Sequence, residues 1–256
     1  MKNTKLTSLF LIILLALPFI GCDKILSEVK VLEENDKGIK AINSGDSEGS
    51  LVHFHNAINL NPKDQETKST IYRNIALAHS DLLNDDSAVV YHKLAANCYK
   101  PGEYFYLINM ADADLFNENI GSAESRLLKA QALNPNEVGA NNSLGLIYLG
   151  EYDDEHYDFN KALIYNKKAF EINGDRITEQ VLAQTYISLD NHDKALLHLT
   201  SVHSQYPGVL DEMLEFAKLD LMYESDLDYS LTFQLIEEVD PTKKEEIEEL
   251  KADFEI

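Results

Sequence analysis

The densest group of reactive side chains lies in one short segment, residues 151–158. Five of its eight residues carry carboxylates, namely Glu151, Asp153, Asp154, Glu155 and Asp158. Carboxylate oxygens are the ligands that hard cations such as Ca²⁺ prefer, and crowded like charges repel one another unless a cation or a basic group compensates them. The segment is therefore a candidate cation site or a loop for a basic partner. The alternative is a solvated turn.

The other titratable residues do not form a pattern typical of an enzyme. His53 and His55 would point to different faces of a helix, and His198 and His203 are five residues apart. Neither pair has the four-residue spacing that a helical metal site favours. The sequence also lacks a Gly-rich phosphate loop, an H-E-x-x-H motif and a G-x-S-x-G motif. We therefore expect a non-catalytic protein without a cofactor, with solvated histidines.

The two cysteines have different surroundings. Lys2 and Lys5 precede an apolar run, Leu9–Ile20, which is too short to span a bilayer and has the length of a signal-peptide core. The run ends at Gly21-Cys22, which resembles the lipobox of bacterial lipoproteins, although Phe19 stands where Leu is usual. The resemblance implies that residues 1–21 are a signal peptide and that Cys22 is lipidated. The alternatives are an ordinary secretory signal or an uncleaved anchor. Cys98 lies among apolar and neutral residues, and we expect it to be a buried free thiol.

The charge of the chain limits its partners. The full sequence has a net charge of -22, and removing residues 1–21 deletes two lysines and no acids, which gives -24. Binding to phosphate backbones needs clustered Lys and Arg, so we expect no nucleic-acid partner. Neutral or basic partners are favoured. The resemblance to a lipobox implies that the protein is also attached to a membrane through a lipid anchor and is located in the cell envelope.

Small residues and prolines recur along the chain with a period near 34. Gly38, Ala76, Ala111, Gly145, Ala183 and Ala217 are spaced by 38, 35, 34, 38 and 34 residues. Further small residues follow most of them at fixed intervals of twelve and nineteen residues, and Pro62, Pro135, Pro207 and Pro241 close four of the intervals. A fixed period of this length indicates a repeat protein.

The pattern resembles the tetratricopeptide repeat, a helix–turn–helix unit with small residues at positions 8, 20 and 27 and Pro at position 32. The Trp that is usual at position 4 is missing, since the chain contains no Trp. The resemblance implies an all-α, right-handed superhelical solenoid. Its six units are 31–64, 69–102, 104–137, 138–175, 176–209 and 210–243. Residues 22–30 then form a tether, and 151–158 lengthens the turn inside the fourth unit.

The spacing has a physical reason. Small side chains let two helices approach where they cross, and Pro ends the second helix of a unit because it cannot continue the backbone hydrogen bonds. After Pro241, residues 244–256 predict one more helix, with Ile247, Leu250 and Phe254 on one face. Such a helix would cap the open end of a solenoid. The alternative is an acidic tail that recruits a basic partner.

The resemblance also implies a binding groove, which in this family is lined by the first helix of each unit. The positions that face a bound peptide carry Arg73, Asn74, Asn109 and Asn142. An Asn amide both donates and accepts, so it can bind the backbone of an extended peptide whatever the peptide's sequence. We therefore expect a membrane-tethered scaffold that binds a partner protein in units two to four. The alternative function is the binding of a small ligand or cation by residues 151–158. The alternative for the groove positions is that they carry solvated polar residues without a binding role.

Overall fold

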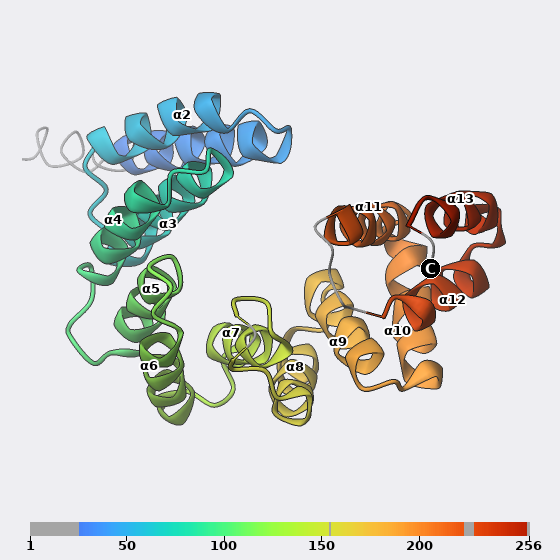
Figure 1. Cartoon of the computed structure of the whole chain (residues 1–256). Coiled ribbons are helices and arrows are strands. Elements are labelled where there is room, and N and C mark those ends of the chain that lie inside the picture. Colours follow the sequence, from blue (N-terminus) through green and yellow to red (C-terminus); the bar gives the residue numbers. More distant parts are fainter. Residues whose placement is uncertain (1–25, 154, 223–227, 255–256) are drawn as a thin grey trace, which may run out of the picture. The chain divides into compact units, whose positions relative to one another are not determined.

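The computed structural model describes residues 26–153, 155–222 and 228–254, and every regular element in these ranges is helical (Figure 1). The all-α prediction is therefore confirmed. The chain divides into two compact units, Met1–Arg126 and Leu127–Ile256, and the boundary falls inside helix α6 (Ile120–Leu133). None of the described helices is both long enough and apolar enough to cross a bilayer.

The N-terminal unit is built from successive helices that pack on their neighbours. A helix at 26–43 is followed by α2 (Ser47–Asn59), α3 (Gln65–Asp81), α4 (Asp85–Ala96), α5 (Tyr104–Leu115) and the first half of α6. α3 packs on α2 and on α4, and α4 packs on α5 (Figure 1). A core cluster at the start of the unit joins the 26–43 helix to α2 and α3 through Val31, Phe54, Ala57, Ile71, Ile75 and Ala78.

The C-terminal unit continues the same arrangement. Its helices after α6 are α7 (Val138–Leu149), α8 (Phe159–Asn173), α9 (Arg176–Ser188), α10 (His192–Gln205), α11 (Val209–Met222) and α12 (Ser230–Val239). A short 3₁₀ turn, Pro241–Lys243, leads into α13 (Lys244–Phe254), which packs near α11 (Figure 1). Ile247 and Leu250 of α13 are buried in the same core cluster as Leu210 and Phe233. A helix is therefore present where the sequence predicts one, and its role as a cap stays a prediction.

The recurring small residues lie in the packed interior. All six residues of the first series, Gly38, Ala76, Ala111, Gly145, Ala183 and Ala217, are buried. At Gly38 an added Cβ would lie 2.4 Å from the ring of Phe54, so only Gly allows this approach of the 26–43 helix to α2. At this position the packing of the two helices requires the small residue of the series. The six unit boundaries remain predictions.

Part of the acid excess is explained by helix capping. The side chains of Asp46, Asp64, Asp158 and Asp175 each accept a hydrogen bond from a backbone N–H in the first turn of the helix that follows. Asn84 and Asn191 cap α4 and α10 in the same way. These caps satisfy N–H groups that a helix leaves unpaired, and the negative charges also suit the positive end of the helix dipole.

Two expectations from the sequence are corrected. Residues 26–30, which were assigned to the tether, are helical, and the carboxylate of Glu28 accepts a hydrogen bond from the backbone N–H of Lys63 at 3.2 Å. Cys98 is only half-buried, and its thiol donates to the carbonyl of Leu94. Burial raises the pKa of this thiol against the opposing influence of Lys68, so it favours the unreactive protonated form.

Candidate binding surfaces

The predicted groove residues of the N-terminal unit begin with neighbours on α3. Arg73 is exposed and has no ion pair or hydrogen bond among the described residues. Asn74 is half-buried, and its amide nitrogen donates to Oδ1 of Asn35 on the 26–43 helix at 2.9 Å. The first helices of the first two repeats are therefore linked by an Asn–Asn hydrogen bond, while the oxygen of Asn74 remains available.

Asn109 on α5 does not present a free amide. The residue is only 2% exposed, its Nδ2 donates to the carbonyl of Phe105 at 2.6 Å, and its Oδ1 is buried without a partner in the described part of the chain. Its expected role as a backbone-contacting groove residue therefore does not fit this conformation. The physical reason is that its nitrogen bonds within its own helix.

One turn further along α5, Asp112 faces His92 of α4. The His92 Nδ1 and the Asp112 Oδ2 are 3.7 Å apart, and the Asp112 side chain is 18% exposed. Burial raises the pKa of Asp112 to about 6, and the nearby charge of Arg73 opposes this rise. Burial, with Arg73 acting in the same direction, lowers the pKa of His92 to about 4. The ring of His92 stacks on Phe116 with 5.3 Å between centroids.

In the C-terminal unit, Asn142 lies on α7 and is half-buried. Its Oδ1 is shielded from solvent and lacks a donor, and among the described residues its Nδ2 has no hydrogen-bond partner either. The neighbouring Asn141 differs, since its Nδ2 donates to the carbonyls of Glu137 and Pro135. Asn142 is therefore a candidate to donate to a ligand, and Asn141 is structural.

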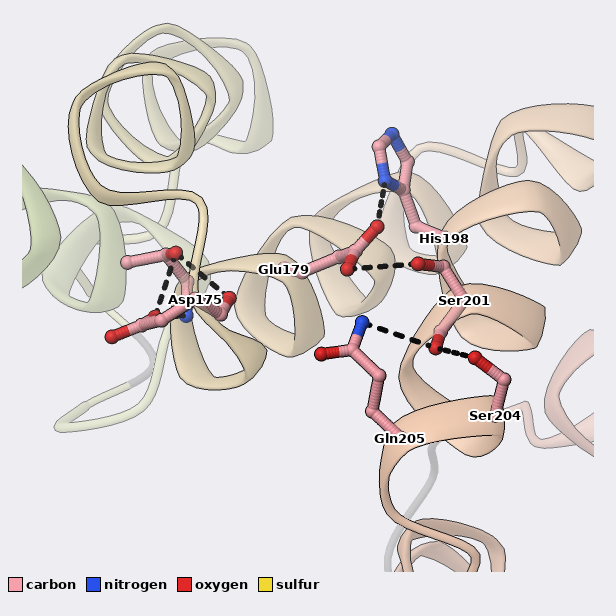
Figure 2. A network of polar contacts seen from close by, with 7 residues as sticks. Asp175, Glu179, His198, Ser201, Ser204 and Gln205 are labelled. Atoms are coloured by element: carbon pink, nitrogen blue, oxygen red, sulfur yellow. Dashed lines mark hydrogen bonds and ion pairs between the residues drawn. The ribbon is translucent and has the colours of Figure 1, made fainter.

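A polar network joins α9 to α10 (Figure 2). The carboxylate of Glu179, a residue only 7% exposed, accepts hydrogen bonds from Nδ1 of His198 at 3.2 Å and from Oγ of Ser201 at 3.0 Å. The imidazole of His198 also stacks on Tyr186 and meets Phe170 edge-on. Both oxygens of this buried carboxylate therefore have donors, as buried charges require.

An open depression of about 530 Å³ runs along α10, lined by Asp193, Leu196, Leu197, Thr200, Ser201 and Ser204. These residues all belong to one face of a single helix. The depression contains one acid, two leucines and three hydroxyl groups, so it offers no distinctive set of charges or metal ligands. Ser201 is shared with the Glu179 network, and Ser204 donates to the carbonyl of Ser201.

The acidic segment between α7 and α8 uses its carboxylates locally. Asp158 caps α8 by accepting from the backbone N–H of Lys161. Asp153 accepts from the backbone N–H groups of Glu155 and His156 and lies 2.7 Å from the His156 ring. Burial would raise the pKa of Asp153, but these hydrogen bonds outweigh it and lower the pKa.

The cation site proposed for this segment stays a prediction. Asp154 lies outside the described residues, and Glu151 and Glu155 are exposed. Nowhere in the described ranges do three His, Cys, Asp or Glu side chains gather closely enough to hold a metal ion. The geometry therefore agrees with a solvated, locally bonded turn.

The helical architecture is similar to that of several solved structures. A thermophilic TPR protein of Thermus thermophilus, TTC0263, is similar with a TM-score of 0.56 and 22% identity, over 73% of this chain and 97% of that one. A chain of the APC/C hetero-tetramer Cut9-Hcn1 is similar with a TM-score of 0.59 and 15% identity, over 92% of this chain and 45% of that longer one. The chain has the tetratricopeptide repeat fold. No protein-family model and no curated protein matches its sequence.

The tetratricopeptide register explains why the sequence did not reveal the Glu179 network. Glu179 occupies position 4 of the predicted unit 176–209, where this family usually has Trp. His198 and Ser201 lie on the second helix of the same unit, so the fold brings side chains 19 and 22 residues apart into contact. The sequence signal that could have revealed the network is Glu179 itself, an acid at a repeat position where the family usually has a buried Trp. The expectation that His198 is solvated was wrong.

The proposed lipidation site, Cys22, lies outside the described residues. Its assignment therefore depends on the sequence alone.

Proposed function

We propose that the protein is a non-catalytic scaffold, tethered to a membrane of the cell envelope, that binds an extended segment of a partner protein along the first helices of its repeats. The observation that carries the proposal is the exposed and unpaired guanidinium of Arg73 beside the half-buried Asn74 on α3. Asn142 provides a similar polar position in the C-terminal unit. The tetratricopeptide fold supports this proposal, since the similar Cut9-Hcn1 structure is an assembly of several chains.

The contact chemistry follows from what each side chain leaves free. Arg73 offers five N–H donors, the amide nitrogen of Asn142 offers two, and the oxygen of Asn74 is an acceptor. A peptide backbone presents complementary carbonyl and N–H groups at every residue. The acid excess favours a neutral or basic partner, and salt should weaken the long-range part of that attraction.

The polar network supports a non-catalytic role. A serine nucleophile needs its hydroxyl to donate to a histidine that acts as a base. Here Ser201 donates to Glu179, and His198 also directs Nδ1 to Glu179. This geometry ties two helices together and leaves Ser201 without an activating base.

The partner surface is tested by paired double substitutions. Arg73→Ala/Asn74→Ala should lose partners that the wild type captures from detergent-solubilised envelopes. The matched control is Lys93→Ala/Asn97→Ala, which removes a cation and an amide from exposed positions at the end of α4, a second helix. If both double variants capture the same proteins with the same affinity, the α3 surface takes no part in binding. Asn142→Ala tests the C-terminal unit separately.

The tether is tested at Cys22. Mass spectrometry of the wild type should show acyl chains on this residue, and Cys22→Ala should move the protein from the membrane to the soluble fraction. The Gly21-Cys22 sequence at the end of the apolar run motivates this prediction. Unchanged membrane partitioning of Cys22→Ala, with no acyl mass on the wild type, would contradict it.

A further inference from the structure

An apolar face is left uncovered at the beginning of the first described helix. Leu26, Val29 and Leu32 are 55%, 44% and 51% exposed, and their spacing of three residues places them along one side of the helix. The buried residues Val31, Asn35 and Gly38 lie on the other side, toward α2 and α3. The helix therefore exposes three apolar side chains on the side that faces away from α2 and α3.

The position of this face in the chain indicates what covers it. Cys22 is four residues before Leu26. Four residues of extended chain span at most about 14 Å, so acyl chains on Cys22 would hold Leu26 within that distance of the lipid surface. The tether would thus keep the apolar face at a high effective concentration near a bilayer.

We propose that Leu26, Val29 and Leu32 form a second membrane contact, with the start of the 26–43 helix lying on the lipid surface that the Cys22 anchor enters. This inference rests on the proposed tether. An amphipathic helix binds a bilayer by burying apolar side chains at the boundary between headgroups and acyl chains. Three side chains are too few for strong binding alone, but the lipid anchor already holds the protein at the bilayer.

The charges around the face define the kind of lipid surface. Lys30 and Glu33 are exposed near the apolar residues, and Glu34 is already paired with Lys37. Residues 26–37 contain four acids and two lysines, and the whole chain is strongly acidic. The contact is therefore apolar and does not depend on anionic lipid.

A second copy of the chain fits the face less well. A stable protein interface buries roughly 800 Å² on each partner, which exceeds what three side chains supply. The bilayer has no such minimum area, because each buried side chain contributes separately.

The experiment measures how deeply position 29 enters lipid. The full, acylated protein carries Val29→Cys, labelled with an environment-sensitive fluorophore in a Cys98→Ser background, on phosphatidylcholine vesicles. We expect a blue shift of the emission and quenching by lipids that are brominated on their acyl chains. The matched control is the same label at Phe216→Cys on α11, because Phe216 is 63% exposed in the other unit. This control should show neither effect.

The possible failures are distinguishable. If the protein does not float with the vesicles and Cys22 carries no acyl mass, the tether is wrong and this inference falls with it. If the protein floats but the label at position 29 gives the same emission with and without vesicles, only the membrane contact is overturned. A blue shift that depends on protein concentration and needs no vesicles would instead show self-association and would also overturn it. Leu26→Gln/Leu32→Gln should abolish the shift while the anchored protein still floats.

Discussion

Each of the two units contains a pair of a largely buried histidine and a largely buried carboxylate, and these two pairs differ in what else the carboxylate binds. In the C-terminal unit Glu179 accepts hydrogen bonds from both His198 and Ser201. In the N-terminal unit Asp112 lies 3.7 Å from His92, which is too far for a hydrogen bond, and the Nδ1 of His92 has no partner among the described residues. Both imidazoles stack on an aromatic ring.

The difference shows that burial and donors have separate effects on a carboxylate. Where donors are lacking, burial dominates, and it raises the pKa of Asp112 while it lowers the pKa of His92. Both groups are thereby pushed toward their neutral forms. Where donors are present, the carboxylate is a structural link between helices. We therefore expect the Glu179 network to stabilise its unit, whereas the desolvated carboxylate of Asp112 should not stabilise its own unit at neutral pH.

The largest expected effect comes from Glu179→Ala. It leaves His198 and Ser201 without their acceptor, which should lower the free energy of unfolding by about 2–3 kcal/mol. Urea unfolding at pH 7, with amide exchange on α9 and α10, measures the change. Glu179→Gln keeps an acceptor and should cost less. Asp112→Ala is the matched variant in the other unit and should not lower the free energy of unfolding at pH 7, because it removes a desolvated carboxylate that accepts no side-chain hydrogen bond among the described residues. Equal losses for Glu179→Ala and Asp112→Ala would remove the distinction between the pairs.

The second prediction concerns pH. The pKa of Asp112 is about 6 in the folded state against an ordinary value of 3.8. Between these values the folded state binds more protons at this group, so the free energy of unfolding falls as the pH rises. The pKa of His92 is about 4 against 6.5, so between those values the unfolded state binds more protons and the free energy of unfolding rises with pH. In the wild type the two contributions oppose each other.

Single substitutions should separate the contributions of Asp112 and His92 to the pH dependence of the free energy of unfolding. Relative to His92→Gln/Asp112→Asn, the variant His92→Gln keeps only Asp112 and should lose about 2–3 kcal/mol between pH 4 and 6. Asp112→Asn keeps only His92 and should gain a similar amount over the same range. The double variant serves as the reference because many other acids titrate in this window. Parallel curves for all three variants would mean that neither group is desolvated as the structure indicates.

A third prediction compares glycines at the same repeat position in the two units. At Gly38 an added Cβ would meet the buried ring of Phe54, and at Gly145 it would meet Oδ1 of Asn166 at 1.7 Å. Overpacking costs about 1–3 kcal/mol, and better helix propensity returns about 1 kcal/mol, so each Gly→Ala should destabilise modestly.

The two sites should differ in how they are rescued. Asn166 donates to Oγ1 of Thr185, but its own oxygen has no donor in the described part of the chain. Asn166→Ala removes both the clash and the unpaired oxygen, so Gly145→Ala/Asn166→Ala should be more stable than the sum of the single losses predicts. Additive losses in thermal unfolding would contradict this coupling.

The fold could be predicted from the sequence because closely packed helices need small residues at regular intervals, and this period is visible in the chain. Gly38, Ala76 and Ala183 are buried as their spacing requires. The site was less predictable, because the same repeat position can hold a free or an engaged amide. Asn109 bonds to its own helix and Asn74 to Asn35, and both choices depend on neighbours that the period does not specify. The Glu179–His198 contact joins two helices, so its spacing of 19 residues has meaning only once the register is known.

The smallest expected effect is that of Arg73→Ala on stability. The charge of Arg73 lowers the pKa values of both Asp112 and His92, so its removal should raise both. Arg73 is exposed, and an interaction through water-accessible surface contributes only a few tenths of a kcal/mol near neutral pH. Molar salt should erase even this difference, since the screening length is then about 3 Å, and Arg73→Lys should behave like the wild type. Because the loss of stability is small, any large loss of partner capture by Arg73→Ala must come from the binding surface. A loss of stability above about 1 kcal/mol would instead show that Arg73 is part of the Asp112–His92 pair, and the pair would then resemble the three-membered network of the C-terminal unit.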